Sequence, residues 1–270
     1  YHGATPSRNK TASRNGWFAN VGKPMKGKQV VLGHINKAKV AALQVDGRLH
    51  DVLIEDTSQL PIGTVLRATV ERPIKGIGGA MVKLPGGSGF LKKNKGLAPG
   101  HVITVQISGF SEEGKARPVT QQIIFKSRYA IVTPDKPGLN ISRKIKSEEL
   151  RDELTLLAKS TMEGCKMGLI LRSIAAVADP EDIEADILEM RGVAESLQRK
   201  VGLTPEILLE GDNPHIQAWR EWSDVTNILV ETNDLEASGA LDQIETAQDP
   251  WVPLGSGGMF IEQTRAMVTV

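Results

Sequence analysis

The sequence predicts an α+β fold of several subdomains, one of which is a small closed β-barrel of the OB type. Residues 64–125 contain five short strand-like runs separated by glycine and proline clusters, a pattern typical of such barrels. Beyond residue 129, strand-like runs alternate with helical patterns, which indicates a mixed α/β region. A chain of 270 residues has room for two to three small domains, each with a buried core.

The segment before the barrel predicts a small meander. Strand-like runs cover 29–33 and 40–45, the Asp46-Gly47 pair indicates a turn, and 49–54 predicts a third strand. A meander this short cannot bury a core by itself, so we expect a later part of the chain to complete it.

The barrel segment carries many basic residues on its predicted loops and faces. Its strand-like runs include 65–70, 80–84, 102–107 and 119–125. Glycines at 76, 78, 79, 86, 87 and 89 lie between them. The basic residues are Arg72, Lys75, Lys83, Lys92, Lys93, Lys95, Lys115 and Arg117.

Helices are predicted after a strand at 129–132. Ser147 is placed to cap a helix over 148–160, and Asp179-Pro180 is a typical start signal for a second one. Between them, residues 167–173 predict a buried strand that ends in an arginine. The second helix carries apolar residues at helical spacing: Ile183, Ile187, Met190, Ala194 and Leu197. Beyond Gly202 we expect an apolar run, a helix over 215–222, a strand over 228–231, a further helix and a hairpin over 259–270.

The formal net charge of +1 conceals a division of charge along the chain. Residues 1–146 contain 24 Lys and Arg against 8 Asp and Glu, whereas residues 147–270 contain 9 against 24. A folded half-chain with so few interspersed acids favours a polyanion-binding surface, and nucleic acid is the first interpretation. A solvated basic face, or contact with a membrane or an acidic protein, is the alternative.

Residues 1–24 contain no acid and no hydrophobic period, which predicts disorder. They are either upstream sequence or a tag, or a basic arm that contacts nucleic acid.

Several function classes are excluded by composition. Cys165 is the single cysteine, so neither a disulfide framework nor a zinc site of several cysteines can form. The five histidines show no metal-ligand spacing. No apolar run approaches the ~20 residues that a membrane span needs, and no signal-peptide core follows the first residues. These observations favour a cytoplasmic protein without a membrane span.

Four segments, in order, resemble consecutive motifs of the ribonuclease E/G family. They are Tyr-Ala-Ile-Val-Thr-Pro at 129–134, Gly-Leu-Asn-Ile-Ser-Arg-Lys-Ile at 138–145, Gly-Leu-Ile-Leu-Arg-Ser at 168–173, and Gly-Gly-Met-Phe-Ile-Glu-Gln-Thr-Arg-Ala-Met-Val-Thr-Val at 257–270. Residues 25–270 can be laid on that family without a large gap. Gly-Phe-Leu at 89–91 is most similar to its short bacterial members.

The resemblance implies a fold in which an S1 barrel and a 5′-sensor region are inserted into an RNase H-like subdomain. The implied boundaries are 25–55 for the first RNase H-like part, 56–126 for the S1 (OB-fold) barrel, 127–205 for the 5′-sensor region, 206–258 for the second RNase H-like part, and 259–270 for the start of a DNase I-like catalytic region.

The resemblance also assigns roles within the barrel. Phe90 matches the aromatic residue on which an RNA base stacks, and Met81 stands where better-known members have a second aromatic. Lys115 matches a basic residue of the same face, and Lys92 and Lys93 are further candidates for RNA contact. The alternative for Phe90 is a residue of the barrel core.

A second site is implied after the barrel. Arg172 and Ser173 match an Arg-Thr pair that grips a 5′-monophosphate, and main-chain groups of Ser127 and Ile131 would complete the pocket. The family often has glycine at the position of Ser127. Arg143 and Lys144 match a basic pair nearby. The alternative for Arg172 is an interior salt bridge with one of the many downstream carboxylates.

The implied function is an endoribonuclease that binds single-stranded and 5′-monophosphorylated RNA in RNA and rRNA processing and decay. Family members cleave with a Mg²⁺-bound water. We expect no catalytic or metal-binding residue within the chain, since the first implied metal-holding Asp would follow Val270. The alternatives are a non-catalytic S1-type RNA-binding protein and, less well matched, a translation-factor-like barrel protein. Homo-oligomerisation stays open.

Overall fold

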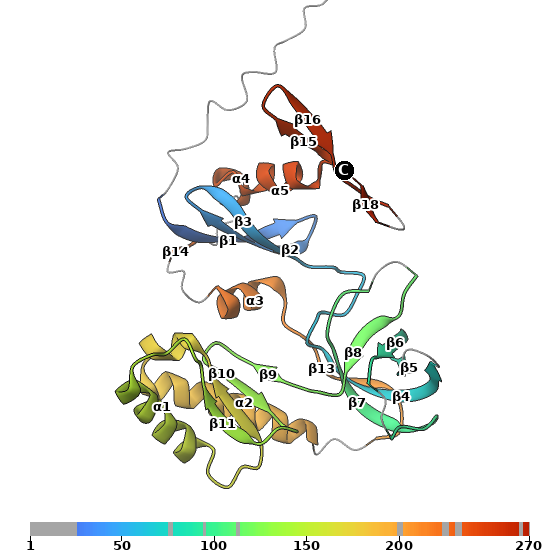
Figure 1. The fold of residues 1–270 in the computed structure, drawn as a ribbon, viewed down its shortest axis with the longest axis vertical. Helices are drawn as coiled ribbons and strands as arrows, with labels where there is room; N and C mark the ends of the chain where they lie inside the picture. The colour runs from blue at the N-terminus through green and yellow to red at the C-terminus, as the bar shows by residue number, and fades with distance from the viewer. Residues whose placement is uncertain are drawn as a thin grey trace, which may run out of the picture. The chain divides into compact units, whose positions relative to one another are not determined.

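The computed structural model describes residues 26–74, 78–93, 96–111, 114–198, 202–222, 227–229, 234–264 and 267–269 (Figure 1). The predicted disorder of residues 1–24 lies outside this part, as do Lys75 and Lys95. The chain divides into two units. The first unit contains the residues up to Gly33, Ala42–Val52 and the residues from Asn227 onward; the second contains His34–Ala41 and Leu53–Thr226.

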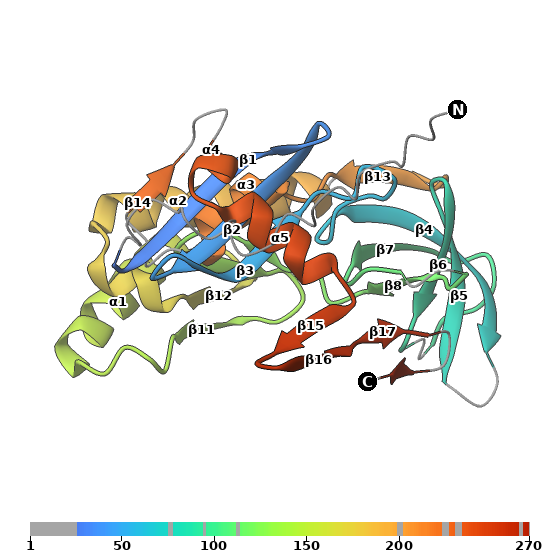
Figure 2. The ribbon, with the colours of Figure 1, turned by 90° about the horizontal axis from the view of Figure 1, so that it is seen from above.

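The first unit is built on a sheet of order β14-β1-β2-β3, in which β14 lies parallel to β1. Its elements are β1 (Lys28–Ile35), β2 (Ala38–Val45), β3 (Arg48–Ile54), β14 (Asn227–Leu229), α4 (Asp234–Ala237) and α5 (Ala240–Gln248). The three predicted strands of the meander are confirmed. Figures 1 and 2 show α4 and α5 along one face of β1–β3. The Gln44 side chain donates to Ser238 O, and Gln243 Oε1 accepts from Leu49 N. A late segment thus completes the meander.

Two short hairpins end the described chain, where the sequence predicted a single hairpin over 259–270. They are β15 (Trp251–Leu254) with β16 (Gly257–Phe260), and β17 (Glu262–Gln263) with β18 (Val268–Thr269). A hairpin within the predicted range is present as β17 and β18, but it starts later than predicted, because Met259 belongs to the preceding hairpin and pairs with Val252. Gly255, at φ 57°, forms the turn, and the rings of Trp251 and Phe260 pack with centroids 4.8 Å apart.

The second unit contains a closed barrel of five strands within the described residues, as predicted. They are β4 (Val65–Ile74), β5 (Gly79–Leu84), β6 (Gly87–Leu91), β7 (Val102–Ile107) and β8 (Arg117–Thr120). The strand order is β4-β5-β6-β8-β7, and a β4–β7 pairing closes the barrel. The β6–β8 pair is parallel and the other pairs are antiparallel. This connectivity confirms the OB type and the α+β class.

One strand that the sequence placed in a later subdomain joins the barrel. Strand β13 (Glu206–Leu209) pairs antiparallel with the start of β4. Arg67, whose side chain is 5% exposed, forms an ion pair with Glu206 across these strands. The guanidinium of Arg67 lies against Gly202, where a Cβ would meet it. Because the pair is mostly desolvated at Arg67, it ties β13 to the barrel.

The remaining part of the second unit is a sheet of order β11-β12-β10-β9 covered by two helices. Its elements are β9 (Phe125–Lys126), β10 (Ala130–Thr133), β11 (Gly138–Ile141), α1 (Glu148–Thr161), β12 (Gly168–Leu171), the 3-10 helix η2 (Ser173–Val177) and α2 (Pro180–Gln198). Ser147 Oγ caps α1 by accepting from Leu150 N, as predicted. Ile183, Ile187 and Ala194 of α2 are buried, with Met190 and Leu197 packed beside them.

A short helix, α3 (Pro214–Glu221), follows β13. Asn213 Oδ1 caps it by accepting from His215 N and Ile216 N, and Pro214 occupies its first turn. No described helix is both long and apolar enough to cross a membrane.

Gly168 and Gly192 allow a matched test of how tightly β12 packs in the mixed sheet. A Cβ on Gly168, in β12, would collide with Lys136 O and come within 2.5 Å of Thr133 Oγ1, whereas a Cβ on Gly192, in α2, would meet nothing within 4 Å. We expect Gly168→Ala to lower the free energy of unfolding by ~1–3 kcal/mol through overpacking. Gly192→Ala should raise it by ~0.5–1 kcal/mol because alanine favours the helix. Urea unfolding measures both, and equal effects would contradict the packing at Gly168.

Candidate nucleic-acid interface

The outer face of the barrel carries a continuous row of four side chains, which we call the outer row: Arg72, Met81, Phe90 and Pro118. Successive strands bring them side by side, since Arg72 pairs with Met81, Met81 with Phe90, and Phe90 with Pro118. Arg72 is exposed and the other three are partly exposed. A charged end and an apolar, aromatic middle form a surface on which a planar base and its phosphate could lie.

Phe90 lies outside the barrel core. Its strand neighbours Gly89 and Leu91 are buried, as is Val82 on β5, and the pleat therefore turns Phe90 to the outer face. The ring rests against Gly79, where a Cβ would lie 2.5 Å from Phe90 Cε2. The alternative position for Phe90, inside the barrel, is thus not the one it adopts. Its contact with RNA stays a prediction.

The predicted basic residues lie at different places around the outer row. Lys92 and Lys93 are exposed directly after β6, one end of which carries Phe90. Lys83, two positions after Met81 on β5, is exposed on the same face. Lys115 precedes β8 and lines a hollow with Arg117 and the β5–β6 turn, so it lies toward the other end of β6.

The residues of the predicted 5′-sensor meet at one end of the strands of the mixed sheet, where β11 and β12 end. Strands β11 and β12 end together, since Ile141 pairs with Leu171, and Ser142 N donates to Leu171 O at 2.9 Å. The exposed Arg143 and Lys144 follow β11 there, while Arg172 and the exposed Ser173 follow β12. The antiparallel β10 begins at the same end, and Arg172 N donates to Tyr129 O at 2.8 Å.

The guanidinium of Arg172 is held by four acceptors. Its Nη1 donates to three main-chain oxygens, those of Ser127 at 2.7 Å, Arg128 at 3.3 Å and Arg220 at 3.0 Å. Its Nη2 forms a 3.0 Å ion pair with Glu221 Oε2, and the side chain is 16% exposed. The interior salt bridge that was the alternative for Arg172 is therefore present. Recognition of a phosphate by Arg172 stays a prediction.

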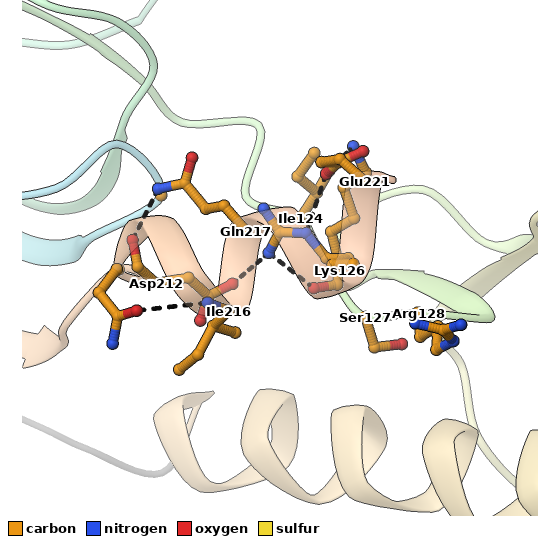
Figure 3. Close-up of polar contacts among 12 residues, drawn as sticks. Ile124, Lys126, Ser127, Arg128, Asp212, Ile216, Gln217 and Glu221 are labelled. Carbon is orange, nitrogen blue, oxygen red and sulfur yellow. Dashed lines mark hydrogen bonds and ion pairs between the residues drawn. The ribbon is translucent and has the colours of Figure 1, made fainter. Parts of the chain in front are cut away.

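Glu221, at the end of α3, joins a group that we call the Arg172 cluster: Lys126, Arg172, Asp212, Arg220 and Glu221. Figure 3 labels Lys126, Asp212 and Glu221 of this cluster. Glu221 Oε1 accepts from Lys126 Nζ at 2.6 Å and from Arg220 Nε at 2.9 Å. Arg220 Nη1 also pairs with Asp212 and donates to Lys126 O. Partial burial tends to raise the pKa of Glu221, but hydrogen bonds from Lys126 and Arg220 and the nearby positive charges outweigh it and hold that pKa below its ordinary value.

Ser127 and Ile131 have structural contacts of their own. Ser127 N donates to Ala130 O at 2.9 Å, and its buried Oγ donates to Asp186 Oδ2. Ile131 lies within β10 between Lys126 of β9 and Ile170 of β12. The Ile131 side chain lines a pocket of about 970 Å³ together with Phe125, Ile170 and residues of the barrel.

Metal-binding side chains do not gather in the described part of the chain. No group of three or more His, Cys, Asp or Glu residues there is placed to hold a metal ion. The residues of the described ranges therefore do not supply a carboxylate cage for Mg²⁺.

Sequence reasoning missed the partners of Arg172. Lys126 precedes the adjacent Arg220 and Glu221 by more than 90 positions in the sequence, and no local pattern links β9 to α3. The sequence of α3 did contain a pattern that indicates an exposed tryptophan. Pro214, Ala218 and Trp222 are buried at a spacing of four, which leaves Trp219 on the other side of the helix, 50% exposed.

Comparison with known proteins finds similarity to one family. Residues 125–238, which include the whole Arg172 cluster, match the model of the Ribonuclease E/G family. Over these residues the chain is similar to the ribonuclease E/G family. It is 27% identical to the ribonuclease E of Nostoc sp. over 227 residues, which are 76% of this chain and 32% of that protein. It is 25% identical to the ribonuclease E of Synechocystis sp. over 226 residues, 76% of this chain and 33% of that protein.

A shorter match, 30% identical over 102 residues, joins the chain to a probable ribonuclease FAU-1 of Staphylothermus marinus; it covers 37% of this chain and 21% of that protein. The chain spans about a third of the length of the two ribonuclease E relatives. The resemblance of the sequence motifs to the ribonuclease E/G family is confirmed by the family match.

The lowered pKa of Glu221 predicts a pH dependence of stability. A carboxyl group whose pKa is depressed by folding stabilises the protein above its unfolded pKa, and this contribution is lost as the pH falls through the folded pKa. We expect the free energy of unfolding to fall more steeply below about pH 4.5 in the wild type than in Glu221→Gln. At neutral pH the variant should be less stable by about 1 kcal/mol, since about a third of the side chain is exposed to solvent.

Chemical unfolding across the acid range measures this difference. Glu184→Gln, at an exposed position of α2, is the matched control and should keep the wild-type slope. Parallel pH profiles for Glu221→Gln and the wild type would contradict the role of Glu221.

Proposed function

We propose that this protein is an endoribonuclease of the ribonuclease E/G type that binds single-stranded RNA on its barrel and recognises a 5′-monophosphate at the Arg172 cluster. The single observation that carries the proposal is the outer row on an OB-type barrel, in a chain similar to this family. In OB folds the outer face of the second and third strands, here β5 and β6, is the usual place for oligonucleotides. Similarity to the ribonuclease E/G family and to a ribonuclease E supports the cleavage of RNA.

Single-stranded RNA suits the outer row because its bases are unpaired. A base would stack on Phe90, with Met81 beside it, while Arg72 at the end of the row and Lys83 on the same face would meet phosphates. Such binding depends on charge and stacking, so it should weaken strongly with salt and depend little on sequence.

A 5′-monophosphate suits the Arg172 cluster because its cations Lys126, Arg172 and Arg220 are already arranged around a carboxylate, that of Glu221. Three main-chain oxygens fix Nη1 of Arg172, and Nη2 is presented to a carboxylate oxygen. A phosphate would take the place of the Glu221 carboxylate, with its oxygens toward Arg172 and Lys126. The exposed Ser173 hydroxyl and the basic Arg143 and Lys144 lie at the same end of the strands.

Mg²⁺ would supply the nucleophile for cleavage by activating a bound water. Among the described residues, no group of three or more His, Cys, Asp or Glu is placed to hold that metal ion, and the proposal of metal-holding carboxylates beyond Val270 rests on the resemblance to the ribonuclease E/G family. A non-catalytic RNA-binding protein is the second candidate, since the outer row and the Arg172 cluster would serve it equally well.

The barrel surface is tested by Phe90→Ala. We expect this change to weaken binding of a single-stranded RNA by ~1–3 kcal/mol, the usual worth of one stacked base, without unfolding the barrel. Fluorescence anisotropy at several salt concentrations measures the affinity, and circular dichroism checks the fold. Leu203→Ala, at an apolar side chain that is 82% exposed away from the outer row, should bind like the wild type. Unchanged affinity in folded Phe90→Ala would remove Phe90 from the site.

The Arg172 cluster is tested with paired RNAs that carry a 5′-monophosphate or a 5′-hydroxyl. The wild type should prefer the phosphate, and Arg172→Lys should lose most of that preference because an ammonium cannot make the forked contact. Glu221→Gln, in which the competing carboxylate is gone, should keep or increase it. Equal binding of both RNAs by the wild type would overturn the 5′-monophosphate assignment.

Catalysis is tested by incubating the purified 270-residue chain with RNA and Mg²⁺. We expect the chain to bind the RNA and leave it intact, and a longer protein that extends beyond Val270 to cut it. Gel analysis of labelled RNA measures cleavage, with EDTA as the control. Robust Mg²⁺-dependent cleavage by the 270 residues would show that the metal site lies within them.

A further inference from the structure

An exposed tryptophan lies directly beside the Arg172 cluster. Trp219 is 50% exposed on α3, although it is not needed to dock that helix, whose packing uses the buried Pro214, Ala218 and Trp222. A large aromatic ring left half in water is costly for a soluble protein, so an exposed Trp beside charged groups suggests a binding surface.

The Trp219 ring is covered on one side by a fixed guanidinium. Arg128 Cζ lies 4.8 Å from the ring centroid, and Arg128 Nη1 donates to the carbonyl oxygen of Trp219 itself at 2.6 Å. This bond holds the cation against the indole of the same residue. The arginine covers one ring face, and the exposed half of the side chain is therefore the surface that a ligand can reach.

The guanidinium of Arg172 also bonds to the main chain next to both members of this cation–π pair. Arg172 Nη1 donates to Arg128 O and to Arg220 O, the residue that follows Trp219. A phosphate at Arg172 and a ring on Trp219 would thus be held by neighbouring residues of one packed group (Figure 3 shows Arg128 next to Ser127 and the end of α3).

We propose that Trp219 and Arg128 form a stacking platform for the 5′-terminal nucleobase of single-stranded RNA whose phosphate binds Arg172. The proposal rests on the proposed 5′-monophosphate site. Planar indole and guanidinium groups both stack on bases, and every base offers such a face, so the platform accepts any nucleobase. Arg128 lies against the ring, and in the neighbouring Arg172 cluster the three cations Lys126, Arg172 and Arg220 outnumber the two carboxylates of Asp212 and Glu221. This excess of positive charge favours a polyanion over an apolar protein segment.

The platform predicts that the protein senses the terminal base separately from the terminal phosphate. The test uses the full chain and four 3′-labelled single-stranded RNAs of one sequence. These carry a 5′-phosphate or a 5′-hydroxyl, each with either a purine or an abasic ribose as the first nucleotide. Anisotropy gives the four affinities. We expect the wild type to bind the phosphorylated purine RNA about 5- to 150-fold more tightly than its abasic counterpart.

Trp219→Ala should reduce this base-dependent difference to within about twofold while the phosphate-dependent difference persists, and Trp219→Phe should retain part of it because a smaller ring still stacks. Trp251→Ala, at a tryptophan of the β15–β16 hairpin that is 39% exposed, is the matched control and should keep the full difference. Trp219→Phe also guards against misfolding of the alanine variant.

Two outcomes overturn the platform: equal binding of purine and abasic RNAs by the wild type, or a base-dependent difference that survives in Trp219→Ala. Unchanged RNA binding by Trp219→Ala together with an altered mass of the protein in solution would reassign this face to a protein contact. Equal affinity of the wild type for the 5′-phosphate and the 5′-hydroxyl RNAs instead rejects the 5′-monophosphate site. Failure of the two proposals can therefore be distinguished.

Discussion

The carboxylate of Glu221 joins three segments that are distant in the sequence. It binds Lys126 on β9, Arg172 after β12 and Arg220 on α3, and so fixes the end of α3 at the edge of the mixed sheet. Ion pairs that make several charged hydrogen bonds and have limited exposure to solvent stabilise the folded state more than isolated surface pairs do. The position of Trp219, the orientation of Arg172 and the contact of Arg128 with the indole all depend on this junction.

At the same junction, the Glu221 carboxylate and a bound phosphate would compete for the same cations. Glu221 satisfies the cations when no ligand is bound, which avoids leaving several positive charges close together. A phosphate that replaces it must bind more tightly than this internal carboxylate. In the proposed function this competition would give selectivity, because a 5′-hydroxyl has no negative charge with which to replace the carboxylate at Arg172. The folded state and the proposed recognition of RNA thus use the same side chains.

The barrel surface depends on a different constraint, the register of its strands. A shift of β6 by one residue against β5 would turn Phe90 inward and place Leu91 in water. The hydrophobic interior therefore fixes which side chains reach the outer row. Gly79 adds a local requirement, since only a residue without a Cβ leaves room for the Phe90 ring beside it.

Local patterns in the sequence determined much of this protein. Helical spacing identified the buried face of α2, Ser147 identified the start of α1, and glycine-separated runs identified the barrel. The family motifs led to Phe90 and Arg172. Only the tertiary structure decided what those residues touch: Phe90 faces outward because of strand pairing, β13 joins the barrel through Arg67, and Arg172 binds a carboxylate 49 positions later. The physical reason is that propensity and periodicity act over a few residues, whereas ion pairs and strand pairing join segments that the chain brings together only when it folds.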